Sequence, residues 1–260
     1  MWSRYDAILI PPTLILMVAV AVGLYFWLRN KSDRAKLIPF MVIGAILLGL
    51  EIAKQIIGFT NPAGYRLFWI PLHVCSIFAF SIPLAAFMKQ KWKATKFFWG
   101  LSLAISVMVV IVVLVAPSAM MGIQVEGIVT NNPSGTWSGT PRLNYATAIF
   151  MDWHSYIYHT VAILFLFVFI ALRPYKPNWH ELLVASGIFM GFMLVAGIMS
   201  RVLETNFAAF RMNNNHELFW LPVVLFVYAI LAAISIMIIM YSPRLYAKIR
   251  RNKEADVPKT

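Results

Sequence analysis

The sequence predicts an all-α protein, a polytopic bundle of seven transmembrane helices that forms a single transmembrane domain over residues 1–260. Three observations support this prediction. Hydrophobic residues make up 61% of the chain, whereas a soluble domain is close to half apolar. Charged residues make up only 12%, which is too few to cover a globule in water. Apolar runs of about 20 residues, the length that spans a bilayer, recur along the chain.

The seven expected spans are separated by breaks that contain charged residues, proline or glycine. The first run is longer than the core of a signal peptide, and four basic residues follow it between positions 29 and 36 as a stop-transfer signal. We therefore expect it to remain as a helix. The spans are expected at 7–28, 37–59, 67–88, 97–117, 145–172, 181–203 and 217–241.

Lysine and arginine predict the orientation of the bundle. The loops and tail on one side carry 16 of these residues, and the loops on the other side carry 4. Because positive residues accumulate on the cytoplasmic side, we expect the N-terminus outside and the C-terminus in the cytoplasm, in a multi-pass protein of the cell membrane. The net charge of +12 then reflects orientation and contact with anionic headgroups, and no nucleic-acid partner is expected.

Two features of the outer side each allow two interpretations. The long connection 118–144 is rich in turn-forming residues, and it is either a flap over the outer face or a disordered connector. The pentapeptides Leu67–Pro71 and Leu218–Pro222 are alike, and both open a span from outside. They fit a 3+1+3 arrangement of parallel repeats, a plan used by some transporters. They also fit a common way for spans to begin, with an interfacial tryptophan and an early proline.

Ionisable residues inside the spans mark the expected functional region, because a charge at the bilayer centre costs about 2.5–3.5 kcal/mol. These residues gather in the outer half of the bundle, whereas the inner half is almost purely apolar. This distribution disfavours a polar channel that runs straight through. The residues are Glu51, His73, Cys75, Asp152, His154 and His159, with Arg201 and Asn206 at the outer ends of the last two spans.

Helical spacing predicts which of these side chains share a face. In the fifth span, His159 shares a face with Asp152, whereas His154 points about 140° away. Only one of the two histidines is therefore expected to face a given centre.

The second and third spans leave a choice between structure and function. Glu51 and Lys54 share a face, either as a structural ion pair or as part of a site. On an ideal helix, Cys75 lies about 200° from His73, so a pair of these two residues requires a distortion at Pro71.

A thiol and histidines within one region fit nucleophilic acyl transfer, which needs a nucleophile, a base within reach and a donor for the oxyanion. Cys75 with His159 or His73 supplies the first two. The alternative is that Cys75 is a small packing residue at a helix contact. A zinc site is disfavoured because no histidine pair has the spacing of a helical metal motif, and we expect no metal or cofactor.

Several short motifs resemble one known family. The segment Trp69–Ser76, which reads WIPLHVCS, is similar to the LPLHLCS signature of the bacterial YwaF-like integral membrane family. Further similar pieces follow in the expected order at Glu51–Gln55, Tyr156–Thr160 and Thr205–Phe207. The resemblance covers most of the chain.

The YwaF-like family is grouped with eukaryotic transmembrane acyltransferases that use a cysteine and a histidine to move fatty acyl chains between glycerophospholipids. The resemblance implies lipid acyl transfer or hydrolysis, with Cys75 as nucleophile, His159 as base, and His73 and Glu51 as supporting groups. In the eukaryotic pattern the cysteine directly precedes the histidine, where this chain has Leu72. Ser76 therefore stays open as an alternate nucleophile, and His154 as an alternate base.

We therefore expect a membrane acyltransferase or acyl hydrolase that acts on a membrane lipid from the outer leaflet. Two other classes remain open. One is a small-molecule transporter or substrate-binding protein with Pro71 and Pro222 as hinges, and the other is an accessory protein whose polar residues only join helices. The sequence does not predict an oligomeric state. The residues expected to bind substrate are Glu51, Asp152, His154, Ser76, Arg201 and Asn206.

Overall fold

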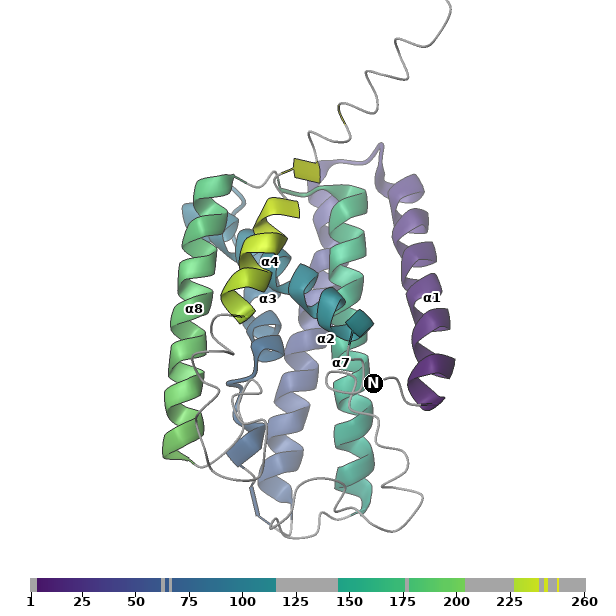
Figure 1. The fold of residues 1–260 in the computed structure, drawn as a ribbon. Coiled ribbons are helices and arrows are strands. Elements are labelled where there is room, and N and C mark those ends of the chain that lie inside the picture. Colours follow the sequence, from purple (N-terminus) through teal and green to yellow (C-terminus); the bar gives the residue numbers. More distant parts are fainter. Residues whose placement is uncertain are drawn as a thin grey trace, which may run out of the picture.

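The computed structural model describes residues 4–61, 64–65, 67–115, 145–175, 178–203, 227–238, 241–242 and 247, and the structural statements below refer to these residues. Within them, all regular elements are helices, which stand together as an upright bundle (Figure 1). The α-helices are α1 (Arg4–Leu28), α2 (Asp33–Thr60), α3 (Phe78–Phe87), α4 (Lys93–Val115), α7 (Tyr145–Leu172), α8 (Trp179–Val202) and the segment Val227–Ile238. The loop 118–144, the second pentapeptide at 218–222 and Asn206 lie outside the described residues.

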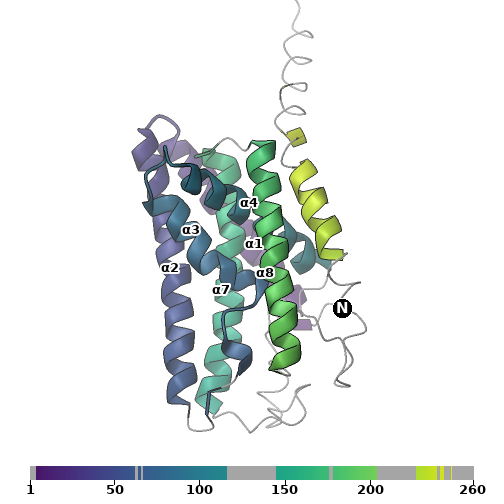
Figure 2. The same cartoon turned by 90° about the vertical axis from the view of Figure 1, so that its left-hand side faces the viewer.

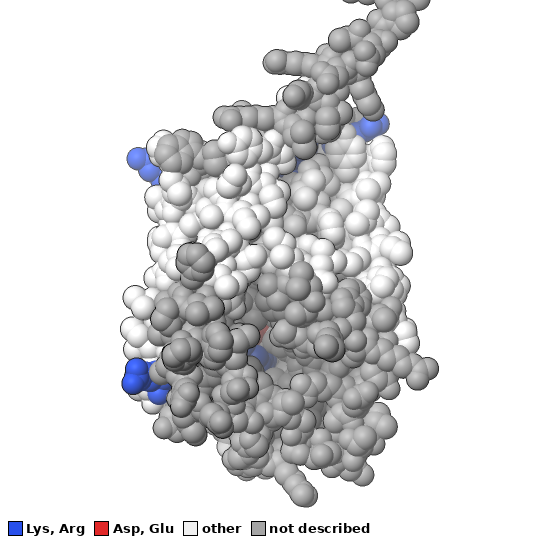
Figure 3. All heavy atoms as spheres, viewed as in Figure 1, with Lys and Arg blue, Asp and Glu red and all other residues white. Residues whose placement is uncertain are grey.

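Five of these helices are long and apolar enough to cross a membrane: α1, α2, α4, α7 and α8. Their outward faces carry large apolar side chains, such as Ile15, Leu16 and Trp27, each more than 60% exposed. In Figure 3, lysine and arginine side chains lie at the upper end of the bundle and at one lower edge. The described surface below the upper end forms an uncharged band, and a basic and an acidic group are visible deeper in the lower half. Such a band is what a bilayer requires of the surface that contacts it. The prediction of an all-helical membrane bundle is confirmed.

Short connections make neighbouring helices antiparallel, and capping residues mark where two of the helices begin. Four residues separate α1 from α2, and five separate α3 from α4. The Ser32 hydroxyl accepts a hydrogen bond from the Ala35 N–H at 3.3 Å and caps α2, while the Asn178 side chain caps α8 through the His180 N–H at 3.2 Å. The side of the membrane on which these connections lie stays a prediction.

The core is built around α2 and α7. Helix α2 packs against α3 and α7, and α7 also packs against α4 and against α1, which lies at one edge of the bundle (Figure 1). Gly44 allows the close approach of α2 and α3, because a Cβ at this position would lie 3.0 Å from the Pro83 backbone. Figure 2 shows α8 and Val227–Ile238 side by side, and α8 also packs against α4.

The predicted third span, 67–88, is broken rather than continuous. It consists of the 3₁₀ helices η1 (Leu67–Trp69) and η2 (Val74–Ile77), followed by the ten residues of α3. The residues between η1 and η2 are not helical, and His73 adopts an extended conformation with φ −82° and ψ 150°. Pro71 explains the break, since it has no N–H to donate and disfavours a helical conformation at Ile70. The orientation of Cys75 relative to His73 therefore does not follow an ideal helix.

Candidate functional site

A buried ion pair on α2 forms one side of the candidate site. The Lys54 Nζ lies 2.7 Å from the Glu51 Oε1, and the two residues are 8% and 4% exposed. An unpaired charge within a bilayer is strongly unfavourable, and the close contact of the two side chains avoids that cost. The ion pair that the sequence allowed for Glu51 and Lys54, which share a helix face, is therefore present.

Gln55 joins this ion pair to the chain that leads to Cys75. Its Nε2 donates to the Glu51 Oε1 and to the Trp69 carbonyl, both at 2.8 Å. The Tyr65 hydroxyl donates to the Gln55 Oε1 at 2.6 Å. Burial and the negative charge of Glu51 raise the pKa of the Tyr65 hydroxyl, which keeps it protonated as a donor. The Gln55 amide thus uses both of its N–H groups and its oxygen.

The break at Pro71 places Cys75 in η2, where its backbone contacts α7. The Tyr158 hydroxyl donates to the Cys75 carbonyl at 3.0 Å. The Cys75 thiol is free and partly exposed, whereas Ser76 is only 1% exposed and donates its N–H to the His73 carbonyl at 3.0 Å. Cys75 is therefore more accessible to a reactant than Ser76.

His154 on α7 is held by α2. Its Nε2 lies 3.1 Å from the Leu50 carbonyl oxygen, and its ring stacks on Tyr158 with 5.5 Å between centroids. A carbonyl oxygen can only accept, so the proton of the neutral ring lies on Nε2. This nitrogen is engaged and cannot act as a base while the hydrogen bond persists.

His159 has the opposite tautomer. Its Nδ1 lies 2.8 Å from the Ser155 carbonyl oxygen, which places the ring proton on Nδ1. Its Nε2 therefore carries a lone pair, and this atom is buried without a hydrogen-bond partner among the described residues. A histidine held through Nδ1–H with an available Nε2 lone pair has the arrangement of a general base.

The charge of Lys54 acts on Cys75, His154 and His159, which come from two other parts of the chain. Tyr158 interacts electrostatically with both Cys75 and Glu51. These groups share one environment, and we call them the polar cluster. Its members are Glu51, Lys54, Gln55, Cys75, His154, Tyr158 and His159.

The remaining sequence candidates are placed as follows. His73 immediately precedes η2 and is partly exposed. Arg201 is exposed in the last turn of α8. The side chain of Asp152 and the whole of Asn206 lie outside the described residues. Convergence of the candidates on one outward-opening cavity stays a prediction.

Sequence reasoning did not assign roles to Gln55, Tyr65 and Tyr158. Gln55 lies four residues after Glu51, a spacing that places both on one helix face. Its bond to the Trp69 carbonyl depends on how the broken span folds back onto α2. Tyr158 lies four residues after His154, a spacing that permits stacking on a helix. Its contact with Cys75 could not be read from that spacing. Within the described part of the chain, no group of three or more histidine, cysteine or carboxylate side chains could hold a metal ion.

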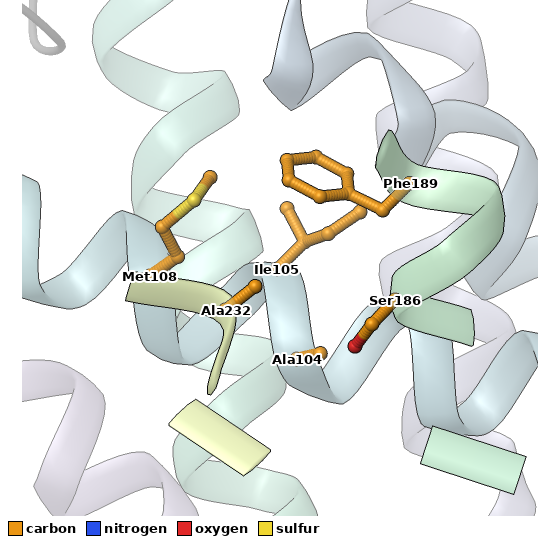
Figure 4. Close-up of a pocket in the computed structure, with 6 residues that line it drawn as sticks. All are labelled: Ala104, Ile105, Met108, Ser186, Phe189 and Ala232. Carbon is orange, nitrogen blue, oxygen red and sulfur yellow. The ribbon is translucent and has the colours of Figure 1, made fainter. Parts of the chain in front are cut away.

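A small apolar hollow has room for about one water molecule (Figure 4). It is bordered by α4, α8 and Val227–Ile238. Phe189 on its wall contacts Tyr228 edge-on at 6.5 Å, and Tyr228 interacts electrostatically with Cys75. The lining residues are Ala104, Ile105, Met108, Ser186, Phe189 and Ala232.

Comparison with known protein families identifies the family to which the chain belongs. The family model of the TMEM164 family matches residues 1–241, which include every described member of the polar cluster. The chain belongs to the TMEM164 family. No curated protein and no solved structure matches it. The TMEM164 match supports an integral membrane protein with several apolar helices, and it lends no support to the narrower bacterial YwaF-like assignment expected from the motifs.

Proposed function

We propose that the protein is an acyltransferase or acyl hydrolase of the cell membrane, with Cys75 as nucleophile and His159 as general base. One observation carries this proposal: the buried His159 Nε2 has a lone pair and no partner among the described residues. The charge of Lys54 acts on both His159 and Cys75. A purely structural histidine in a bilayer would be expected to use both ring nitrogens.

The geometry favours His159 over His154 as the base. The His154 Nε2 donates to the Leu50 carbonyl and its ring stacks on Tyr158, which suits a residue that joins α7 to α2. Among the described residues, His159 makes its hydrogen bonds within its own helix turn. Its ring therefore contributes no hydrogen bond between helices, and its free nitrogen serves the chemistry.

The proposed reaction proceeds in two half-reactions. The Cys75 thiol gives its proton to the His159 Nε2, and the sulfur attacks the ester carbonyl carbon of a lipid to form a tetrahedral oxyanion. Collapse breaks the carbon–oxygen ester bond, leaves an acyl thioester on Cys75, and the leaving alkoxide takes the proton from His159. An acceptor hydroxyl then gives its proton to the His159 Nε2 and attacks the thioester carbonyl carbon. The carbon–sulfur bond breaks, and the departing Cys75 sulfur takes the proton back from His159. A lysolipid acceptor gives transfer, and water gives hydrolysis.

A lipid is the substrate that suits this position. The polar cluster lies among helices that cross the membrane, and Cys75 is partly exposed within that bundle. A glycerophospholipid of the outer leaflet supplies both the ester and the acyl chain.

The break at Pro71 also favours one rival function. Transporters bind substrates at interrupted spans near the middle of the membrane, and the third span here is interrupted next to Glu51 and Lys54. A transporter would need no thiol. Chemical trapping of an acyl group on Cys75 therefore separates the two functions.

The test uses the full chain in vesicles that contain a phospholipid with a labelled acyl chain and an unlabelled lysolipid. Wild-type protein is expected to transfer label to the lysolipid and to carry a thioester on Cys75, the single cysteine of the chain, visible by intact-mass spectrometry. Cys75→Ala and His159→Ala should each abolish both signals, and the double variant should be no worse than either single one. Full activity in Cys75→Ala would overturn the proposal.

A further inference from the structure

Tyr158 on α7 contacts both residues of the proposed reaction. Its hydroxyl donates to the Cys75 carbonyl at 3.0 Å, and Tyr158 is only 2% exposed. Tyr158 directly precedes His159 in the chain, so their Cα atoms are about 3.8 Å apart. Its ring also meets the His159 ring edge-on, with 6.1 Å between centroids. Tyr158 therefore links the backbone of the proposed nucleophile to the helix turn that carries the proposed base.

The Cys75 carbonyl lies where the broken span passes into α3. It also accepts a hydrogen bond from the Phe78 N–H, so its two lone pairs have one donor from the backbone and one from Tyr158. The 3₁₀ helix η2 that contains Cys75 has four residues, and 3₁₀ helices have poorer hydrogen-bond geometry than α-helices. The anchor from α7 therefore adds a constraint that so short a helix does not supply by itself.

Tyr158 is itself held in place from α2. The His154 ring stacks on the Tyr158 ring with 5.5 Å between centroids and 27° between ring planes. The His154 Nε2 donates to the Leu50 carbonyl on α2 at 3.1 Å. A continuous series of contacts thus runs from α2 through His154 and Tyr158 to Cys75. Because the ring is stacked and buried, the direction of the Tyr158 hydroxyl is fixed.

Packing alone does not require the Tyr158 hydroxyl. A phenylalanine at this position would fill the same space and could stack on His154 in the same way. A hydroxyl buried among membrane-spanning helices is unfavourable unless it is hydrogen-bonded. The Cys75 carbonyl already accepts from the Phe78 N–H, so it does not need the Tyr158 hydroxyl to avoid being left without a donor. The remaining consequence of the bond is that it fixes where the Cys75 backbone lies.

We infer that Tyr158 is a positioning residue for the acyl transfer: its hydroxyl holds the Cys75 backbone in register with His159, so that the thiol reaches the His159 Nε2. This inference rests on the function proposed above. Tyr158 acts through Cys75 and does not bind the lipid. In a catalytic site, a misplacement of about 1 Å can reduce the rate by about 10²-fold. Loss of the hydroxyl should therefore lower kcat and leave KM unchanged.

The first experiment compares two tyrosines of α7 in the label-transfer assay, with the full chain in vesicles. Tyr156 is the matched control, because its hydroxyl forms a hydrogen bond between helices with the Thr13 hydroxyl on α1, away from Cys75. Tyr158→Phe should lower kcat per folded molecule about tenfold or more and keep KM within about twofold. Tyr156→Phe should keep both constants within about twofold of wild type. Equal kcat values in the two variants would overturn the inference.

The second experiment measures alkylation of Cys75, the single cysteine, by N-ethylmaleimide in lipid nanodiscs with intact-mass spectrometry. A base that takes the thiol proton speeds alkylation, so His159→Ala should slow it about tenfold. Tyr158→Phe should slow it about fivefold, and the double variant should be no slower than His159→Ala, because Tyr158 acts through the same pair. Losses that multiply in the double variant would indicate an independent structural effect and overturn the inference. Faster alkylation in Tyr158→Phe, or an unchanged rate in His159→Ala, would also overturn it.

The two experiments together separate this inference from the proposed function. Acyl transfer that requires Cys75 and His159 but is equal in Tyr158→Phe and Tyr156→Phe would reject the role of Tyr158 and keep the proposed function. Absence of transfer by the wild type, with alkylation slowed in Tyr158→Phe and no further loss in the double variant, would reject the proposed function. That result would keep Tyr158 as the residue that positions the thiol relative to His159.

Discussion

The two ends of the α2–α7 contact bury opposite kinds of side chain. Near the start of α2, Phe40 packs edge-on against Trp99 and Phe165, with ring centroids 5.1 and 5.8 Å apart. Phe169 completes this group, which we call the aromatic cluster. The polar cluster begins at Glu51, which lies about 16 Å farther along α2 at 1.5 Å per residue. The same two helices therefore carry an apolar core at one level and ionisable groups at another.

This contrast shows two ways to stabilise helices inside a membrane. The aromatic cluster relies on close packing of rings, which needs no polar partner. The polar cluster relies on specific bonds, and each side chain there depends on another for its position. The described exception is the His159 Nε2, which has no partner. A buried nitrogen without a hydrogen-bond partner lowers the stability of the protein. Packing does not explain why this arrangement is kept, so we expect the His159 Nε2 to have a function.

The largest effect should separate the two histidines. His159→Ala should reduce acyl transfer about 10²–10⁴-fold, the usual range for loss of a general base. His154→Ala should retain activity within about tenfold per folded molecule and lower stability instead, because it loses the Leu50 bond and the Tyr158 stack. The assay is label transfer normalised to folded protein. Equal losses in the two variants would contradict the assignment of His159.

Phe40→Ala should separate packing from chemistry. The side chain is fully buried, so its removal should lower the free energy of unfolding by about 3–5 kcal/mol. Thermal unfolding in detergent measures this loss. Acyl transfer per folded molecule should stay unchanged, because Phe40 lies about 16 Å from Glu51 along α2 at 1.5 Å per residue. A change in acyl transfer per folded molecule would show that the two levels of the bundle are coupled.

Gln55→Met tests the link between α2 and the broken span. The substitution keeps the length of the side chain but removes its bonds to Glu51, Tyr65 and the Trp69 carbonyl. Stability should fall by about 1–3 kcal/mol, and acyl transfer should fall with it, since the chain before Cys75 loses its anchor. Tyr65→Phe removes only one of these bonds and should cost about 0.5–1.5 kcal/mol. A larger loss in Tyr65→Phe than in Gln55→Met would contradict this account.

A pair of glycine substitutions on α2 compares a crowded position with an open one, and the open position, Gly49, should give the smallest effect. At Gly58 a methyl group would meet the Trp69 ring at 2.8 Å, so Gly58→Ala should destabilise the protein by about 1–3 kcal/mol. Gly49 has no atom within 4 Å of an added Cβ, so Gly49→Ala should stay within about 1 kcal/mol of wild type. Unfolding midpoints of the two variants provide the comparison. Equal midpoints would show that the Trp69 ring shifts at little cost to make room for the added methyl group.

Much of the fold follows from local properties of the sequence. The apolar lengths indicated where helices form, because the need to satisfy backbone hydrogen bonds within lipid acts on each segment separately. The break in the third span was signalled by Pro71, whose effect on the backbone is also local. The division of α2 and α7 into an apolar and a polar part could be read directly from the order of their residues.

The partners of the polar residues depended on the tertiary structure. Helical spacing placed His154 and His159 on different faces and suggested that one of them would face the site. In the structure both are buried. His154 contacts α2, whereas His159 bonds within its own turn. The contacts of Gln55 with Trp69 and of Tyr158 with Cys75 join residues distant in sequence. Such contacts depend on how each helix is rotated and how the broken span folds back, which only the packing of all the helices together decides.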